Sequence, residues 1–211
     1  METINKINIC ETEGRILEAA RIVFLEKGLE RTKMQDIADA ASISRTALNY
    51  YFRKKEILYK RILEQIFYTI VPSVESIIEK KIPIFEKLNE IVDVYDKMFR
   101  ENRTFPRFVF NELQRNPKML LDYLKDNKDA LNYIDKLKIF LDSELGKYSV
   151  KNIAVEHIFT TFFSLLVAPY LLNPVICEYS GIDSPVADKL LDEHKIIVKE
   201  IMKNMMNSLN A

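Results

Sequence analysis

The sequence predicts an all-α protein of about nine helices, three short ones at the N-terminus and six mostly longer ones after them. Glycine is scarce, with 4 residues in 211, and the alternation of apolar and polar residues that is typical of strands is hard to find. Apolar residues instead recur at helical spacing through most of the chain. Hydrophobic residues make up 48% of the sequence, which is enough for a substantial core.

The first two helices are marked by their ends. Apolar residues at helical spacing begin at Ile16, and Gly28 provides a natural stop. Thr32 and Gln35 have the spacing of a capping box, in which each side chain bonds the backbone of the other. We therefore expect a second, short helix over 33–40.

A third short helix should follow almost at once. Residues 41–43 are enough for a tight turn, and Ser44 is placed to cap a helix that ends near Tyr50. Two short helices joined by a three-residue turn are the geometry of a helix-turn-helix, here over 33–52. The second helix of such a motif lies in the major groove of DNA while the first supports it.

Six further helices complete the prediction. Their expected ranges are about 54–70, 84–99, 105–114, 117–145, 150–172 and 186–208. Pro72 should kink or break a helix because proline lacks a backbone N–H. The pair Asn173-Pro174 and residues 181–185 should mark a loop. Gly146 is expected to end the helix before it.

Charge is unevenly distributed along the chain. The net charge is zero, yet residues 31–61 carry an excess of five positive charges, and residues from 62 onward carry an excess of three negative ones. A local basic patch on a mildly acidic protein is typical of phosphate contact. The alternative is a basic face that is merely solvated.

Residues 12–66 resemble the N-terminal domain of the TetR/AcrR family of regulators. The matching residues are Arg15-Ile16-Leu17-Glu18-Ala19-Ala20, Phe24, Glu26-Lys27-Gly28, Thr32, Met34, Asp36-Ile37-Ala38, Ala41, Ile43-Ser44-Arg45, Leu48, Tyr51-Phe52 and Lys55-Glu56-Ile57-Leu58. The resemblance implies a DNA-binding domain over 10–70 and an effector-binding and dimerisation domain over 71–211. The second part shows only the helical layout of the family.

Within this motif, the polar residues of the third helix are candidates for DNA contact. Arg45 and Asn49 are four residues apart and share a face. Arginine can bond guanine in the major groove and asparagine can bond adenine. Ser44, Thr46 and Tyr50 are more suited to phosphates. An ordinary solvated helix surface is the alternative.

Lysines supply the other candidates, Lys33, Lys54 and Lys55. Lysines at a helix N-terminus are unfavourable because the positive end of the helix dipole lies there. A phosphate bound at this end would stabilise the basic run 53–55. The chain departs from the family at Thr46-Ala47, where Gly-Thr is usual, at Asn49, where Tyr is usual, and at Lys54, where a capping Ser is common. These departures affect the contact pattern and the operator sequence.

The C-terminal part should bind an effector and form a dimer, as the resemblance implies. A nearly all-apolar helix over 150–172 must be covered on every side, and pairing the last two helices with those of a second copy would do so. An apolar pocket with few polar anchors would suit a small apolar or amphipathic effector. The pocket candidates are Phe99, Phe108, Tyr123 and Phe162; plain core is their alternative role.

Several classes are disfavoured. Neither the two cysteines nor His157 and His194 have metal-ligand spacing, so we expect no metal and no cofactor. The apolar run Ile158–Leu172 is shorter than the ~20 residues of a membrane span, and the N-terminus lacks a signal peptide. The sequence predicts a cytoplasmic, dimeric, ligand-responsive repressor that binds a palindromic double-stranded operator. A DNA-binding regulator without an effector, and an all-α enzyme or carrier, are the alternatives.

Overall fold

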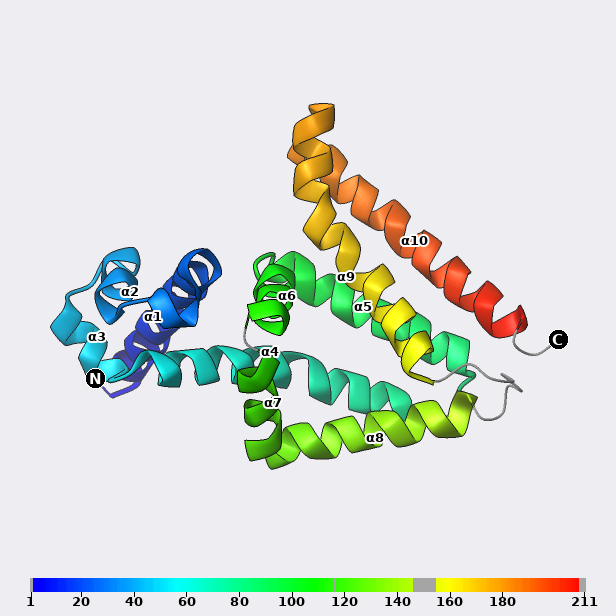
Figure 1. Ribbon diagram of the computed structural model, residues 1–211, viewed down its shortest axis with the longest axis horizontal. Coiled ribbons are helices and arrows are strands. Elements are labelled where there is room, and N and C mark those ends of the chain that lie inside the picture. Colours follow the sequence, from blue (N-terminus) through cyan, green and yellow to red (C-terminus); the bar gives the residue numbers. More distant parts are fainter. Residues whose placement is uncertain (1, 116, 146–154, 209–211) are drawn as a thin grey trace. The chain divides into compact units, whose positions relative to one another are not determined.

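The computed structural model describes residues 2–115, 117–145 and 155–208, in which all regular structure is helical (Figure 1). The all-α class is therefore confirmed. The helices are α1 (Glu2–Arg31), α2 (Met34–Ala40), α3 (Arg45–Tyr51), α4 (Lys55–Ile78), α5 (Ile84–Glu101), α6 (Phe105–Arg115), α7 (Pro117–Asp126), α8 (Lys128–Leu145), α9 (Val155–Ser180) and α10 (Ser184–Ser208).

The helices pack into two compact units. The first unit comprises Met1–Tyr68 and Arg107–Tyr123, and the second comprises Thr69–Pro106 and Leu124–Ala211. Residues of α6 and α7 thus pack with the N-terminal helices. The assignment of DNA binding to 10–70 and of effector binding and dimerisation to 71–211 concerns function and stays a prediction.

The first unit is built around a closed apolar core. Ile16 and Phe24 of α1, Ile37 of α2 and Leu48 of α3 are each fully buried. Gly28 has φ 73°, in the left-handed region that favours glycine, so the helical path of α1 is interrupted where a stop is predicted. The chain can then turn back from α1 into α2.

The predicted capping box at the start of α2 is wrong. The Thr32 hydroxyl donates to the Gly28 carbonyl at 2.7 Å, which turns this side chain back towards α1. Lys33 is the N-cap residue of α2, and its N–H donates to the Asp36 carboxylate at 2.7 Å. The Asp36 carboxylate, three residues after the N-cap, therefore accepts the bond from the N-cap N–H that the Gln35 side chain was expected to accept.

Prolines do not break the helices in which a break is predicted. The helix α4 continues through Pro72 to Ile78, and α9 continues through Pro174 to Ser180. The expected loop at Asn173-Pro174 is therefore wrong. The loop after α9 begins instead at Gly181, where φ is 64°.

The described residues form ten helices, one more than expected, because a helix cap was missed in the sequence. The stretch expected as one helix divides at Asn127 into α7 and α8. The Asn127 side-chain oxygen accepts hydrogen bonds from the N–H groups of Asp129 and Ala130, at 3.0 and 3.1 Å. This is an N-cap, which starts a new helix. The expected stop at Gly146 and the start of the next helix at 150–154 lie outside the described residues.

In the second unit α5 packs against α9 and α10, and α8 packs against α9 (Figure 1). The apolar face of α5 is largely buried, with Ile84, Leu88 and Ile91 at most 5% exposed. These contacts surround the pocket described below.

The helix α9 is longer and more exposed than the sequence suggests. Its 26 residues make it long and apolar enough to cross a membrane by length and composition, and an 18-residue window within Glu156–Ser180 has a mean hydropathy of 1.6. Only 22% of its most apolar stretch is buried. The expected covering of this helix is therefore not supplied within one chain, and an apolar surface is left uncovered.

Candidate nucleic-acid interface and ligand pocket

The connection between α2 and α3 is a tight turn fixed by backbone hydrogen bonds. The Ile43 N–H donates to the Ala38 carbonyl at 3.0 Å, and Ser42 between them has φ 55°. The Arg15 guanidinium, from α1, donates to the Ala41 carbonyl at 3.1 Å. The predicted helix-turn-helix over 33–52 is confirmed, with its turn held against α1.

The third helix begins where the sequence predicts. The Ser44 hydroxyl accepts a hydrogen bond from the Ala47 N–H at 3.0 Å, which makes Ser44 the N-cap of α3. Leu48 is fully buried beneath the helix and Phe52 is 6% exposed at its end. Burial of one face leaves the polar residues of α3 on the outside.

The outer ridge of α3, which comprises Arg45, Thr46, Asn49 and Tyr50, brings the predicted reading residues together. The Arg45 guanidinium donates to the Asn49 side-chain oxygen, so these two residues share a face. Thr46 and Asn49 are exposed, and Tyr50 is 80% exposed although its ring is large and apolar. An exposed polar ridge on the second helix of a helix-turn-helix is suited to the major groove.

The three candidate lysines differ in their surroundings. Lys33 and Lys54 are exposed at the starts of α2 and α4. The Lys55 ammonium instead donates to the carbonyls of Leu29, Glu30 and Thr32, at 2.7, 2.8 and 3.0 Å. An ammonium has three donors, so Lys55 ties α4 to the end of α1 and keeps none for a phosphate in this arrangement.

One acidic residue stabilises the start of α2 beside these lysines. Asp36 lies 2.8 Å from the Lys27 ammonium and accepts from the Lys33 N–H. Its hydrogen bond with Lys27, followed by the one with the Lys33 backbone, lowers the pKa of this exposed carboxyl. The carboxylate is therefore ionised at neutral pH and offsets part of the basic charge around the ridge.

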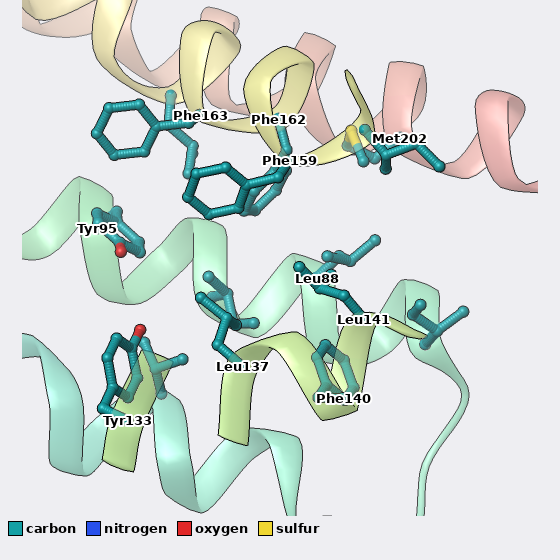
Figure 2. A pocket seen from close by; sticks show the side chains of 15 residues that line it. Leu88, Tyr95, Tyr133, Leu137, Phe140, Leu141, Phe159, Phe162, Phe163 and Met202 are labelled. Carbon is teal, nitrogen blue, oxygen red and sulfur yellow. The ribbon is translucent and has the colours of Figure 1, made fainter. Parts of the chain in front are cut away.

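The second unit contains an apolar pocket of about 600 Å³, part of which is open to solvent. It lies between α4, α5, α8, α9 and α10, and Figure 2 shows Phe159, Phe162 and Phe163 facing Leu137 and Phe140 across it. The remaining lining residues are Val74, Ile84, Leu88, Ile91, Tyr95, Tyr133, Leu141, Ile158, Leu166 and Met202. This apolar composition is typical of small-molecule sites.

Two phenols supply the polar atoms at one end of the pocket. The hydroxyls of Tyr95 and Tyr133 point toward one another (Figure 2) and are hydrogen-bonded. Burial raises the pKa of both, and the neighbouring Tyr95 adds to the effect on Tyr133. Both groups are thus neutral at neutral pH.

Of the four predicted pocket residues, the structure places one in this pocket, Phe162. Phe99 instead packs edge to face against Tyr170, with ring centroids 5.0 Å apart. Phe108 and Tyr123 are buried in the first unit, Phe108 against Tyr59. Helical spacing shows that these rings are buried, but it does not show which of two cores they enter. Tyr133 was missed because nothing in its neighbourhood distinguishes it from a surface residue.

Comparison with known proteins places the helix-turn-helix in a family. Residues 16–62 match the model of the bacterial regulatory proteins of the tetR family. The probable HTH-type transcriptional regulator YttP of Bacillus subtilis is 23% identical over 198 residues, which cover 91% of this chain and 94% of that protein. The biofilm operon negative transcriptional regulator IcaR of Staphylococcus epidermidis is 22% identical, over 63% of this chain and 74% of that protein.

Solved structures show the same fold. The ketosteroid transcriptional regulator KstR2 of Mycobacterium tuberculosis superposes with a TM-score of 0.62 at 18% identity, covering 89% of this chain and 93% of that one. The fold, the ridge and these relatives define a DNA-binding transcriptional regulator with a helix-turn-helix. The family match over residues 16–62 and these curated regulators support a TetR family transcriptional regulator.

Proposed function

We propose that the protein is a dimeric, ligand-responsive repressor that binds a palindromic operator in the cytoplasm and has no enzymatic activity. The observation that carries this proposal is the pairing of an exposed reading ridge in one unit with an apolar pocket in the other. A regulator without an effector would be expected to have a fully packed second unit. The pocket therefore favours the ligand-responsive form.

The α3 ridge is the part that would read the operator. Arg45 and Asn49 are suited to base edges, and their mutual hydrogen bond fixes both side chains before DNA arrives. Ser44, Thr46 and Tyr50 flank them and are suited to phosphates. Lys33 and Lys54 add exposed positive charge, whereas Lys55 acts through the position of α4.

The exposed apolar faces of α9 and α10 support a homodimer. Leu172, Val175 and Tyr179 repeat at helical spacing on α9 and are 55, 66 and 93% exposed. Ile197 and Ile201 on α10 are 51 and 40% exposed. A second copy that presented the same faces would form a four-helix bundle and remove these side chains from water. A membrane is the other apolar partner that such a surface could meet.

Repression would follow from dimer geometry. A two-fold dimer presents two α3 ridges to half-sites ~34 Å apart, or a multiple of that, on one face of the DNA. A ligand that binds better to a second arrangement would shift the population away from this spacing and release the operator. The relative IcaR is named as a negative regulator, which supports the direction of control.

The test is a titration of the purified protein against DNA from upstream of its own gene, followed by fluorescence anisotropy. We expect Arg45→Ala to weaken binding by about 1–3 kcal/mol and to relax preference at one base pair. Arg103→Ala, which changes an arginine of the second unit, is the matched control and should bind normally. Unchanged affinity in Arg45→Ala would remove that residue from the reading set.

The dimer is tested in the same preparation. Sedimentation should give a dimer for the native chain and a monomer for Val175→Glu, since a charge at the centre of an apolar interface opposes association. The monomer should also lose operator affinity because it presents a single ridge. A monomeric native chain, or a chain that sediments with added vesicles, would overturn this part of the proposal.

A further inference from the structure

We infer that Asn49 acts on the operator through Arg45: it is a positioning residue that holds the arginine for one base, and it reads no base itself. This inference rests on the proposed function, because it divides the work of the α3 ridge between two of its residues. It is carried by the direction of the bond between the two side chains, the competition for the Asn49 oxygen, and the surroundings of Arg45.

The bond between Arg45 and Asn49 fixes which end of the amide faces the arginine. The Arg45 guanidinium donates to the Asn49 side-chain oxygen. A guanidinium has donors only, so the amide nitrogen cannot replace the oxygen in this contact. The Asn49 oxygen is therefore turned along the ridge toward Arg45, at the start of α3.

The same oxygen would be needed to read a base. An asparagine that identifies adenine accepts from the N6 amino group and donates to N7 at the same time. A carbonyl oxygen has two lone pairs, so the stronger of two bonds decides which way the amide turns. Hydrogen bonds with a charged donor are roughly twice as strong as neutral ones, and Arg45 is therefore favoured over adenine as the partner of Asn49.

The surroundings of Arg45 leave Asn49 as its anchor in the free protein. Helix α3 contains no carboxylate, and the two acids of α2 are bonded to Lys27 and Gln35. Among the described residues, the Asn49 oxygen is the one hydrogen-bond acceptor that the Arg45 side chain contacts. A long arginine side chain loses rotamer freedom when it binds, and an anchor that holds it beforehand lowers this cost.

The experiment measures the affinity of the full chain for duplexes from upstream of its own gene, in which each base pair of the bound site is changed in turn. Arg45→Ala should lower the preference at one base pair by about fivefold to 150-fold. Asn49→Ala should lower the preference at that same base pair by about threefold to tenfold, the effect of one hydrogen bond, and at no other. The double variant should match Arg45→Ala to within about twofold, because the two residues act as one unit.

Two results of this series would overturn the inference. If Asn49→Ala relaxed the preference at a different base pair, or if the two losses added, Asn49 would read a base directly. If Asn49→Ala left every preference unchanged, the contact with Arg45 would have no part in recognition.

Asn49→Asp separates the oxygen from the rest of the amide. The carboxylate still accepts from Arg45, but it has no N–H to give to a base. Its charge should weaken binding to all duplexes alike, while the preference at the Arg45 base pair stays within about twofold of the native value. Loss of that preference would contradict the inference. Thr46→Ala, on the same ridge, is the control and should weaken all duplexes alike without changing any preference.

Nuclear magnetic resonance of the free protein separates this inference from the proposed function, because it needs no DNA. The side-chain N–H of Arg45 should be more ordered than that of Arg53, an exposed arginine, and Asn49→Ala should make the two alike. An Arg45 as mobile as Arg53 in the native chain would overturn the inference even if the operator is bound. An ordered Arg45 in a chain that binds all duplexes alike would instead overturn the proposed function, and the inference would fall with it.

Discussion

The two units of this protein fill their interiors differently. In the first unit, Phe24 and Phe108 pack edge to face or tilted on Tyr59, whose hydroxyl donates to the buried Glu112 carboxylate at 2.8 Å. The second unit has an apolar pocket among its side chains, part of which is open to solvent. A closed core fixes one shape, whereas a hollow core leaves room for a ligand to change the packing.

The polar contacts of the units differ as well. In the first unit Arg15, Thr32 and Lys55 donate to backbone carbonyls, so they fix the path of the chain. In the second unit α10 is joined to α5, and to Arg103 just after α5, by side-chain ion pairs that run antiparallel, here called the α5–α10 ladder. Its pairs are Asp93–Lys199, Asp96–Lys195, Arg100–Asp192 and Arg103–Asp188, at 2.7, 3.1, 2.7 and 2.7 Å.

The largest effect should come from matched phenylalanine truncations in the two cores. Phe24→Ala removes a fully buried ring from the closed core and should lower the free energy of unfolding by about 3–5 kcal/mol. Phe162→Ala removes a half-buried ring that already borders empty space and should cost about 1 kcal/mol. Urea denaturation followed by circular dichroism measures both. Equal losses would mean that the pocket is closed in solution.

A second prediction concerns the lysine that joins α4 to α1. Lys55→Met removes three charge-assisted bonds to carbonyls and should lower the free energy of unfolding by about 2–3 kcal/mol. Since its donors are engaged, the variant should leave the salt dependence of DNA binding unchanged.

Lys54→Ala is the control for this prediction, because Lys54 is exposed and adjacent. It should leave stability unchanged and reduce the slope of log affinity against log salt by about 0.9. The reverse pattern, with the lower slope in Lys55→Met, would mean that Lys55 leaves the carbonyls and contacts a phosphate when DNA binds.

The contrast between the first and the second unit also explains which features could be predicted from the sequence. The helix-turn-helix is specified locally, since Ser44 caps α3 from a position three residues before its partner and Leu48 and Phe52 mark the buried face. Local signals of this kind can be recognised without the fold. The Thr32 error is also local, because Thr32–Gln35 and Lys33–Asp36 are two overlapping capping patterns and the Thr32 hydroxyl donates to the Gly28 carbonyl instead of capping α2.

The pocket could not be predicted in this way because its lining comes from five helices far apart in the sequence. Tyr95 lies on a face that periodicity identifies correctly as apolar, but only the packing of α8 brings Tyr133 to it. Continuation of α4 through Pro72 and of α9 through Pro174 was missed for a related reason. Propensity disfavours proline inside a helix, and packing over the length of a long helix overrides one lost hydrogen bond.

The smallest effect should come from the α5–α10 ladder, and it should depend on pH. Asp96 is 13% exposed and accepts from Tyr170, Arg100 and Lys195 at 2.6, 2.9 and 3.1 Å. Burial alone would raise its pKa, but these bonds outweigh burial and lower it. A carboxyl with a depressed pKa in the folded state adds stability above its unfolded pKa, and this stability is lost as pH falls through the folded value, below about pH 4.

We therefore expect Asp96→Asn to lower the free energy of unfolding by about 1–2 kcal/mol at neutral pH, with the difference from the native chain shrinking below about pH 4. Thermal melting over a pH series measures this. Arg103→Ala breaks the pair with Asp188, whose side chains are 58 and 40% exposed, and should cost less than about 0.5 kcal/mol at any pH because solvent screens exposed pairs. If both variants lost the same stability, burial of Asp96 would not matter, and the ladder would act as a set of equal surface pairs.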